Sequence, residues 1–98
     1  MPRPLCIRRV GAKPPAVYFK PAGIPLVMLK EVVVSMDEFE AVRLKDSLGL
    51  EQKKAAKRMG ISQPTFHRLL SSARKKISDA LTNGKAIKIE GGAFFFIS

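Results

Sequence analysis

The sequence is poor in several residue types, and each shortage excludes a class of protein. It has one cysteine, one histidine and no tryptophan in 98 residues. One cysteine cannot close an internal disulfide, and with a single histidine it cannot supply the four ligands of a structural zinc site, so we expect a reducing compartment and neither metal nor cofactor. No apolar stretch approaches the roughly 20 residues of a membrane span, and no signal-peptide core is present. We therefore expect a soluble cytoplasmic protein without a membrane partner.

Acidic residues are also scarce relative to basic ones. The chain has 18 Lys and Arg against 8 Asp and Glu, which gives a net charge of +10. Two basic blocks, residues 1–30 and 51–85, flank an acidic segment at residues 31–50. This balance predicts a polyanionic partner, and nucleic acid is favoured over an acidic membrane surface. Because no Gly-rich phosphate loop, nucleophile elbow or acid pair is recognisable, we do not expect an enzyme.

Proline is nearly absent after the first thirty residues, which hold six of the seven prolines. This excludes a long helix there and predicts an extended basic N-terminal arm over residues 1–30. The β-branched run Val32 to Val34 and the alternating residues 86–89 each favour a short strand, and the two could pair as a two-stranded β element. The tail in residues 86–98 ends in "AFFFIS", for which the sequence indicates no partner.

Three helices are expected between these segments, in a domain over residues 31–85. Ser35 and Glu38 have the spacing of a capping box, so a first helix should begin there and extend to about residues 46–47, with Phe39 and Val42 facing inward. A short second helix should span residues 51–58.

The third helix has the clearest pattern. Its apolar residues fall within a stripe about 120° wide. These residues are Phe66, Leu69, Leu70, Ala73, Ile77, Ala80 and Leu81. The Asn83-Gly84 pair supplies the stop signal.

The break between the second and third helices has the spacing of a helix-turn-helix. Gly60 permits the positive φ of a sharp turn, and Ser62 can cap the next helix with Pro64 in its first turn. The pattern is carried by Ala56, Gly60, Ile61, Phe66 and Leu69. It predicts a mainly α fold in which the N-terminal end of a recognition helix, about residues 63–81, projects toward a major groove.

This geometry assigns two sets of DNA contacts. Gln and Arg can pair bidentately with adenine and guanine edges, so the start of the recognition helix is assigned to bases: Ser62, Gln63, Pro64, His67, Arg68 and Ser71. Phosphates are assigned to cations on the helices and on the arm: Lys53, Lys54, Arg74, Lys75, Arg3, Arg8 and Arg9. No catalytic or metal-binding residue is assigned.

Several strings together resemble a known family. They are "MPRP", "YFKPAGIPL", "EAVRLKD", "AAKRMGISQPTFHRLLSSARKKISDAL" and "NGKAIKIEGG", in this order over about residues 1–92. They are similar to the small prokaryotic family of unknown function 134, also called UPF0251, whose members are predicted DNA-binding proteins similar to region four of bacterial sigma-70 factors. The resemblance implies a sigma-region-four-like helix-turn-helix in a transcriptional regulator.

These observations predict sequence-specific binding of double-stranded DNA in transcription regulation, at the nucleoid, with a homodimer as one option. Two alternatives stay open. The protein could bind RNA or other nucleic acid non-specifically through its charge. It could also be a module that contacts RNA polymerase, with Asp37, Glu38 and Glu40 of the first helix as the contact surface.

Overall fold

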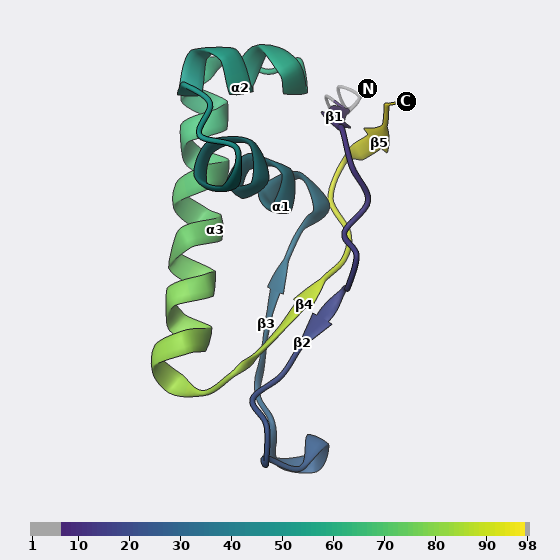
Figure 1. The fold of residues 1–98 in the computed structure, drawn as a ribbon, viewed down its shortest axis with the longest axis vertical. Helices are drawn as coiled ribbons and strands as arrows, with labels where there is room; N and C mark the ends of the chain where they lie inside the picture. The colour runs from purple at the N-terminus through teal and green to yellow at the C-terminus, as the bar shows by residue number, and fades with distance from the viewer. Residues whose placement is uncertain (1–6, 98) are drawn as a thin grey trace, which may run out of the picture.

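The computed structural model describes residues 7–97 and shows an elongated body with helices on one side and strands on the other (Figure 1). In that range the chain forms three α-helices, a 3₁₀ turn, a π-helical segment and five short strands. The long helix α3 follows the long axis, α2 crosses one end of it, and the 3₁₀ turn η1 (Leu26–Met28) lies at the opposite end.

The helices begin and end at the predicted caps. α1 (Met36–Val42) starts with the capping box of Ser35 and Glu38 and continues as the π-helical segment η2 (Arg43–Ser47). α2 (Gln52–Met59) ends at Gly60 and α3 (Gln63–Asn83) ends at Gly84, and both glycines are left-handed, with φ of 71° and 64°. The positions of all three helices are confirmed.

The strands form two sheets. β2 (Tyr18–Phe19), β4 (Ala86–Ile89) and β3 (Glu31–Val34) make a three-stranded sheet with β4 in the centre, antiparallel to β2 and parallel to β3. β1 (Arg8–Val10) and β5 (Phe94–Phe96) make a separate parallel pair.

The prediction of a mainly α fold is therefore wrong, because the described residues form an α/β mixture. The expected pairing of residues 32–34 with 86–89 is present, but within a three-stranded sheet. Two further segments, one proline-rich and one a run of phenylalanines, supply strands of only two or three residues. Strands this short leave no periodicity in the sequence, and their partners lie far along the chain.

The main core lies where the three helices meet. Phe66 and Leu70 of α3 are fully buried against Leu44 and Met59, with small alanines from α1 and α2 between them. This packing fixes α2 relative to α3. The small side chains allow the helix backbones to approach closely.

Some residues predicted to face inward are less buried than the core. On the first helix Ala41 and Leu44 are fully buried, whereas Phe39 and Val42 are half-buried, with Val42 packed against the main core. Leu81 is 76% exposed, at the rim of an open hollow that it lines together with Phe19 and Ile87 of the sheet. Among the described helices, none is both long and apolar enough to span a bilayer.

Candidate functional site

The turn between α2 and α3 sets the direction of the longest helix. The amide of Ile61 donates to the Ala56 carbonyl at 3.1 Å, so the chain reverses tightly around the left-handed Gly60. Ser62 then caps α3: its Oγ accepts from the Thr65 amide at 3.2 Å. The first turns of α3 therefore project beside α2. We call the exposed surface of residues 52–71 the α2–α3 surface.

Two open hollows lie on either side of the start of α3. One, of about 450 Å³, is lined by Gln52, Gln63, Pro64, His67 and Arg68. The other, of about 420 Å³, is lined by Arg8, Lys57, Gly60, Ile61, Ser62 and Thr65. The structure thus gathers four of the residues that the sequence assigns to bases around one hollow. Ser62, also assigned to bases, lines the other hollow with Arg8, which is assigned to phosphates.

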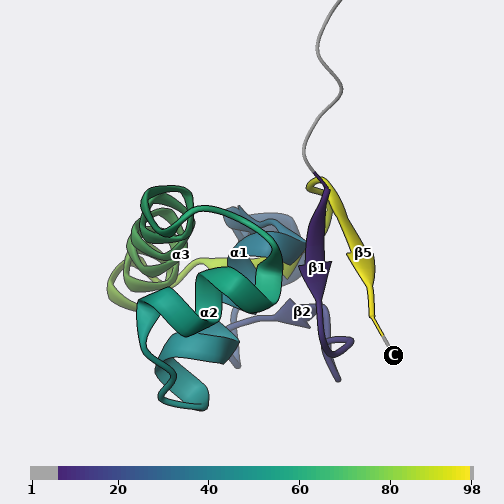
Figure 2. The ribbon, with the colours of Figure 1, turned by 90° about the horizontal axis from the view of Figure 1, so that it is seen from above.

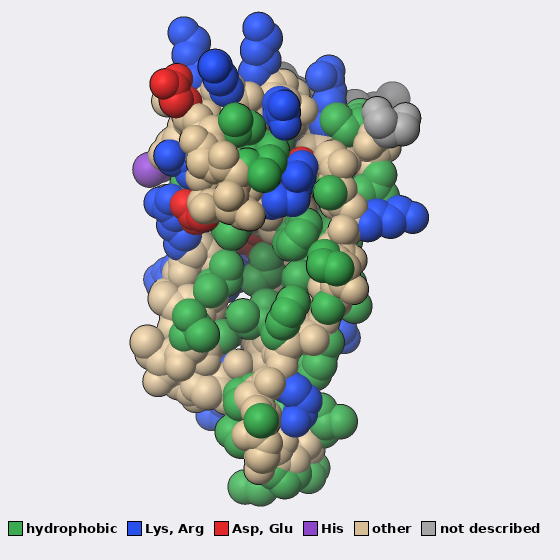
Figure 3. Space-filling view, viewed as in Figure 1, with side chains coloured by type: hydrophobic (Ala, Val, Ile, Leu, Met, Phe, Trp, Pro, Cys, Tyr) green, Lys and Arg blue, Asp and Glu red, His purple; other side chains and the backbone are tan. Residues whose placement is uncertain are grey.

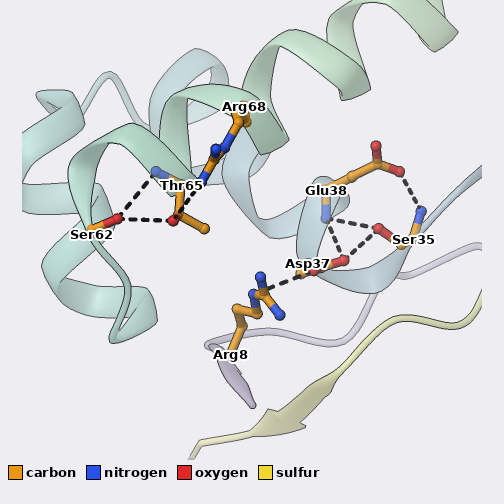
Figure 4. Close-up of polar contacts among 7 residues, drawn as sticks. All are labelled: Arg8, Ser35, Asp37, Glu38, Ser62, Thr65 and Arg68. Atoms are coloured by element: carbon orange, nitrogen blue, oxygen red, sulfur yellow. Dashed lines mark hydrogen bonds and ion pairs between the residues drawn. The ribbon is translucent and has the colours of Figure 1, made fainter. Parts of the chain in front are cut away.

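A chain of polar contacts holds the first turn of α3 (Figure 4). The Ser62 hydroxyl bonds to Thr65 Oγ1 at 2.9 Å, and Arg68 Nη2 donates to the same Thr65 oxygen at 3.3 Å. This contact uses one of the five N–H donors of the guanidinium. Arg68 is exposed, as are Gln63 and His67, so these side chains can meet a ligand without rearrangement of the core.

The cations of α2 all face outward. Lys53, Lys54, Lys57 and Arg58 are exposed, while Ala55 and its neighbours are buried. Figure 3 shows Lys and Arg side chains gathered over α2 at one end of the molecule and hydrophobic side chains at the opposite end. On this face, several positive side chains therefore gather at the end of the molecule that α2 forms.

The first strand brings two arginines to this surface. Arg9 lies against the turn: a Cβ built on Gly60 would be 3.3 Å from Arg9 Nε. Arg8 contacts Asp37 of α1, with Nε and Oδ2 at 3.7 Å (Figure 4). Both are held in β1 rather than on a loose arm, while Arg3 lies outside the described residues.

The remaining assigned residues lie further along α3. Ser71 and Lys75 are exposed. Arg74 forms a bidentate pair with Asp46, at 2.6 and 3.0 Å. This hydrogen-bonded pairing lowers the pKa of Asp46 and raises that of Arg74. Arg74 is therefore partly neutralised, unlike the lysines of α2.

The acidic residues of α1 lie inside the protein. Asp37, Glu38 and Glu40 are all 5% exposed or less. Glu40 accepts from the Gly11 amide at 2.7 Å and pairs with Arg43 at 2.6 Å. The expectation that these carboxylates form a contact surface finds no support in their positions.

Glu38 bonds α1 to the long helix α3. It accepts from Lys76 Nζ at 2.7 Å, from the Ser35 amide at 2.9 Å and from the Ser72 hydroxyl. Burial alone would raise the pKa of Glu38, but these hydrogen bonds and the charge of Lys76 outweigh it and lower the pKa below 4.5. Glu38 is therefore ionised at neutral pH and bonds α1 to α3.

Three polar side chains of the two hollows were not assigned as DNA contacts from the sequence. Lys57, Gln52 and Thr65 line them. The periodicity of α2 predicts that Lys57 faces outward. That Lys57 lies close to the start of α3 follows only from the folded turn. Within residues 7–97, no three His, Cys, Asp or Glu side chains lie close enough together to hold a metal ion.

Comparison with known proteins gives family relatives but no structural one. Residues 1–96 match the family described as protein of unknown function DUF134. The chain is 57% identical over 97 residues to a UPF0251 protein of Moorella thermoacetica, covering 99% of this chain and 65% of that protein. It is 61% identical over 94 residues to one from Dehalococcoides mccartyi strain BAV1, covering 96% and 80% respectively. The chain thus spans just under two thirds of the Moorella protein, and no solved structure matches it.

Proposed function

This chain belongs to the DUF134 (UPF0251) family of proteins of unknown function, and we propose that it binds double-stranded DNA sequence-specifically, as a regulator of transcription. In this proposal α2 and α3 act as a helix-turn-helix similar to sigma region four, and α3 is the recognition helix. The observation that carries the proposal is the α2–α3 surface, where exposed polar side chains at the start of α3 are flanked by exposed lysines of α2. No catalytic step is part of it.

The dimensions of α3 suit the major groove. A helix with its side chains is about 10–12 Å across, and the major groove of B-DNA is about 12 Å wide. Gln63, His67 and Arg68 lie around one hollow at the start of α3 and are exposed. Gln63 offers an amide for an adenine edge and Arg68 a guanidinium for a guanine edge. These two side chains are the proposed readers of sequence.

Cations around the turn would hold the phosphate backbone. Lys57 and Arg8 line the second hollow together with the Ser62 cap of α3, and Arg9 lies against Gly60. A phosphate there would meet positive side chains and the positive end of the α3 dipole. Such contacts set affinity and orientation, while the base contacts set specificity. The protein would then act at the chromosome in the cytoplasm.

The two alternatives have less support. Double-stranded RNA has a deep, narrow major groove that does not admit a helix, so the exposed start of α3 would have no place in it. A polymerase contact through the acids of α1 would require the buried Glu38 and Glu40 to leave their partners, Lys76 and the Gly11 amide.

The test is selection of genome fragments with the purified protein, followed by binding measurements on the best fragment and a scrambled duplex over a salt series. We expect the selected site to bind about 10³-fold or more tighter than the scrambled one. Arg68→Ala should narrow that ratio. Arg58→Ala, which removes the same charge from the outer face of α2, is the matched control and should lower both affinities together.

Equal affinity for the two duplexes, with only a salt-dependent difference, would show a charge-driven binder and contradict the proposal. An equal loss of specificity in Arg58→Ala and Arg68→Ala would contradict the assignment of α3 as the reader.

A further inference from the structure

The last strand leaves one of its edges open. Among the described residues β5 pairs with β1 alone. Viewed along the long axis, β1 lies between the helices and β5, so that β5 forms the outer margin of the molecule (Figure 2). A two-stranded sheet is marginally stable by itself, and a strand on its margin can pair with another chain.

The hydrogen bonds between β1 and β5 show which backbone groups remain for such a partner. The Arg8 amide donates to the Ala93 carbonyl at 3.0 Å, and the Ile97 amide donates to the Val10 carbonyl at 2.9 Å. Successive residues of a strand direct their backbone groups to opposite edges. The N–H and C=O groups of Phe94 and Phe96 therefore point away from β1, toward the open edge.

The side chains of β5 carry none of the features that usually block pairing at an open strand edge. Phe95, Phe96 and Ile97 are 45%, 39% and 40% exposed, and residues 91–97 contain no charge and no proline. Soluble proteins usually block such an edge with lysine, proline or a bulge. An apolar, uncharged and open edge indicates that another strand covers it.

We propose that a second copy of this chain covers β5, by antiparallel pairing of the two β5 strands about a two-fold axis. Because the chain carries +10 charges, two copies repel each other wherever their cations meet, whereas β5 carries no charge of its own and the Lys13 ammonium beside it lies over the Phe96 ring, 5.5 Å from the centroid. A two-fold axis makes the same strand fit itself. The other large apolar surface, the 3₁₀ turn η1 with Val27 91% exposed, offers no strand edge.

The free backbone groups set the register. With the axis at Phe95, each Phe94 lies opposite Phe96 of the second copy, and these residues exchange N–H···O=C bonds through the groups that point outward. The two Phe95 residues then form the non-hydrogen-bonded pair, with Cα atoms about 4.5 Å apart. Phe94 and Phe96 already stack edge to face, at 5.2 Å between ring centroids, and would join the same rings of the second copy.

The axis also determines where the two α2–α3 surfaces lie. Figure 2 looks along the long axis, and β1 and β5 lie side by side across that view. A two-fold axis perpendicular to this pair runs nearly along the long axis, so rotation leaves α2 at the same end in both copies. Both copies would therefore present their α2–α3 surfaces in one direction. This last consequence rests on the proposed DNA binding, whereas the interface itself does not.

The interface is tested without DNA, by sedimentation velocity of the full chain over a concentration series in about 0.3 M salt, where the Debye length falls below about 8 Å. We expect the average mass of the wild type to rise from that of a monomer to that of a dimer as the protein concentration increases. Phe95→Lys should stay at the monomer mass, since it places two like charges opposite each other. Val27→Lys is the matched control at the far end and should dimerise like the wild type.

The register is tested by disulfide formation in a Cys6→Ser background. Phe95→Cys should link two chains on mild oxidation, because its Cα atoms meet across the axis. Phe96→Cys should not, because its two copies lie about 8 Å apart on the diagonal, beyond the reach of a disulfide. Circular dichroism of each variant confirms that it is folded.

A wild-type chain that is monomeric throughout the series would overturn the proposal, as would a dimer that survives Phe95→Lys. Equal linking of both cysteine variants would overturn the register. Loss of DNA binding in any variant would not affect these readouts, so this inference and the proposed function can fail separately.

Discussion

The acidic residues of α1 and the basic residues of α2 illustrate opposite uses of charge in one small domain. Asp37, Glu38 and Glu40 are buried and bonded to internal partners, whereas Lys53 and Lys57 are exposed on α2. The buried acids join separate elements: Glu38 bonds to α3 and Glu40 to the Gly11 amide. The lysines have no such structural role, so their charge is available to a partner.

The difference also changes how the net charge is interpreted. Three of the eight acids lie below the surface and face their own cations. The exposed acids beside α2 are Glu51 at its N-cap and Asp46, which is already paired with Arg74. Composition alone gives the excess of positive charge, but the separation of bonded and exposed charges appears only in the folded chain.

The largest expected effect comes from removing one of the buried acids of α1. Glu38→Ala removes the acceptor of Lys76, Ser72 and the Ser35 amide, and should lower the free energy of unfolding by about 2–3 kcal/mol. Urea denaturation measures it. Lys53→Ala on the exposed side is the control and should change stability by less than about 0.5 kcal/mol. Similar losses in both variants would show that the distinction between the two regions is wrong.

The stabilisation from Glu38 should also depend on pH in a defined direction. The lowered pKa of Glu38 means that the folded state favours its ionised form, so the stabilisation is present above the ordinary value of 4.5 and is lost as pH falls through the folded-state pKa. The stability gap between wild type and Glu38→Gln should therefore be full at pH 7 and shrink below pH 4.5. A gap that is constant from neutral to acidic pH would contradict the role of ionisation.

A smaller effect is expected on the exposed side. If Lys57 contacts a phosphate, Lys57→Ala should weaken binding of all duplexes alike and reduce the slope of log affinity against log salt by about 1. Lys30→Ala removes the same charge from an exposed site near η1, at the opposite end. The slope of that control should match the wild type. If Lys57→Ala and Lys30→Ala have the same salt slope, Lys57 does not contact a phosphate.

The smallest effect is expected at the exposed ion pair between Asp46 of η2 and Arg74 of α3. Asp46→Asn should cost less than about 1 kcal/mol of stability, because solvent screens an exposed pair. It should also free the Arg74 guanidinium from its ion pair and modestly raise the affinity for DNA, whereas Lys57→Ala lowers that affinity. Arg74→Gln, which removes the cation instead, is the paired variant. Unchanged affinity in Asp46→Asn would indicate that Arg74 does not face DNA.

The helical part of the fold could be predicted because its signals are local. The capping box of Ser35 and Glu38 lies within four residues, and Gly60 and Gly84 mark the helix ends directly. The exposed face of α2 also follows from its periodicity. For this reason the sequence alone predicts which polar residues lie around the start of α3.

The strands and the buried acids could not be predicted, for a different reason. β1 and β5 pair across almost the whole chain, and nothing near Phe95 in the sequence indicates Arg9 as its neighbour. Likewise Glu38 looks like an ordinary acid in the first turn of a helix, because Lys76 is distant in sequence. Both features depend on contacts that only the folded topology creates.

The pairing of β1 with β5 also constrains when the protein can be completed during its synthesis. β1 leaves the ribosome before any other strand, yet its partner β5 is the last described element to be made. Closing so long a loop is slow, and it cannot begin until Phe96 has been added. Arg8 and Arg9 therefore gain their strand partner only after the helices have had time to pack. Within residues 7–97, the surface beside Gly60 is therefore completed only after β5 has been made.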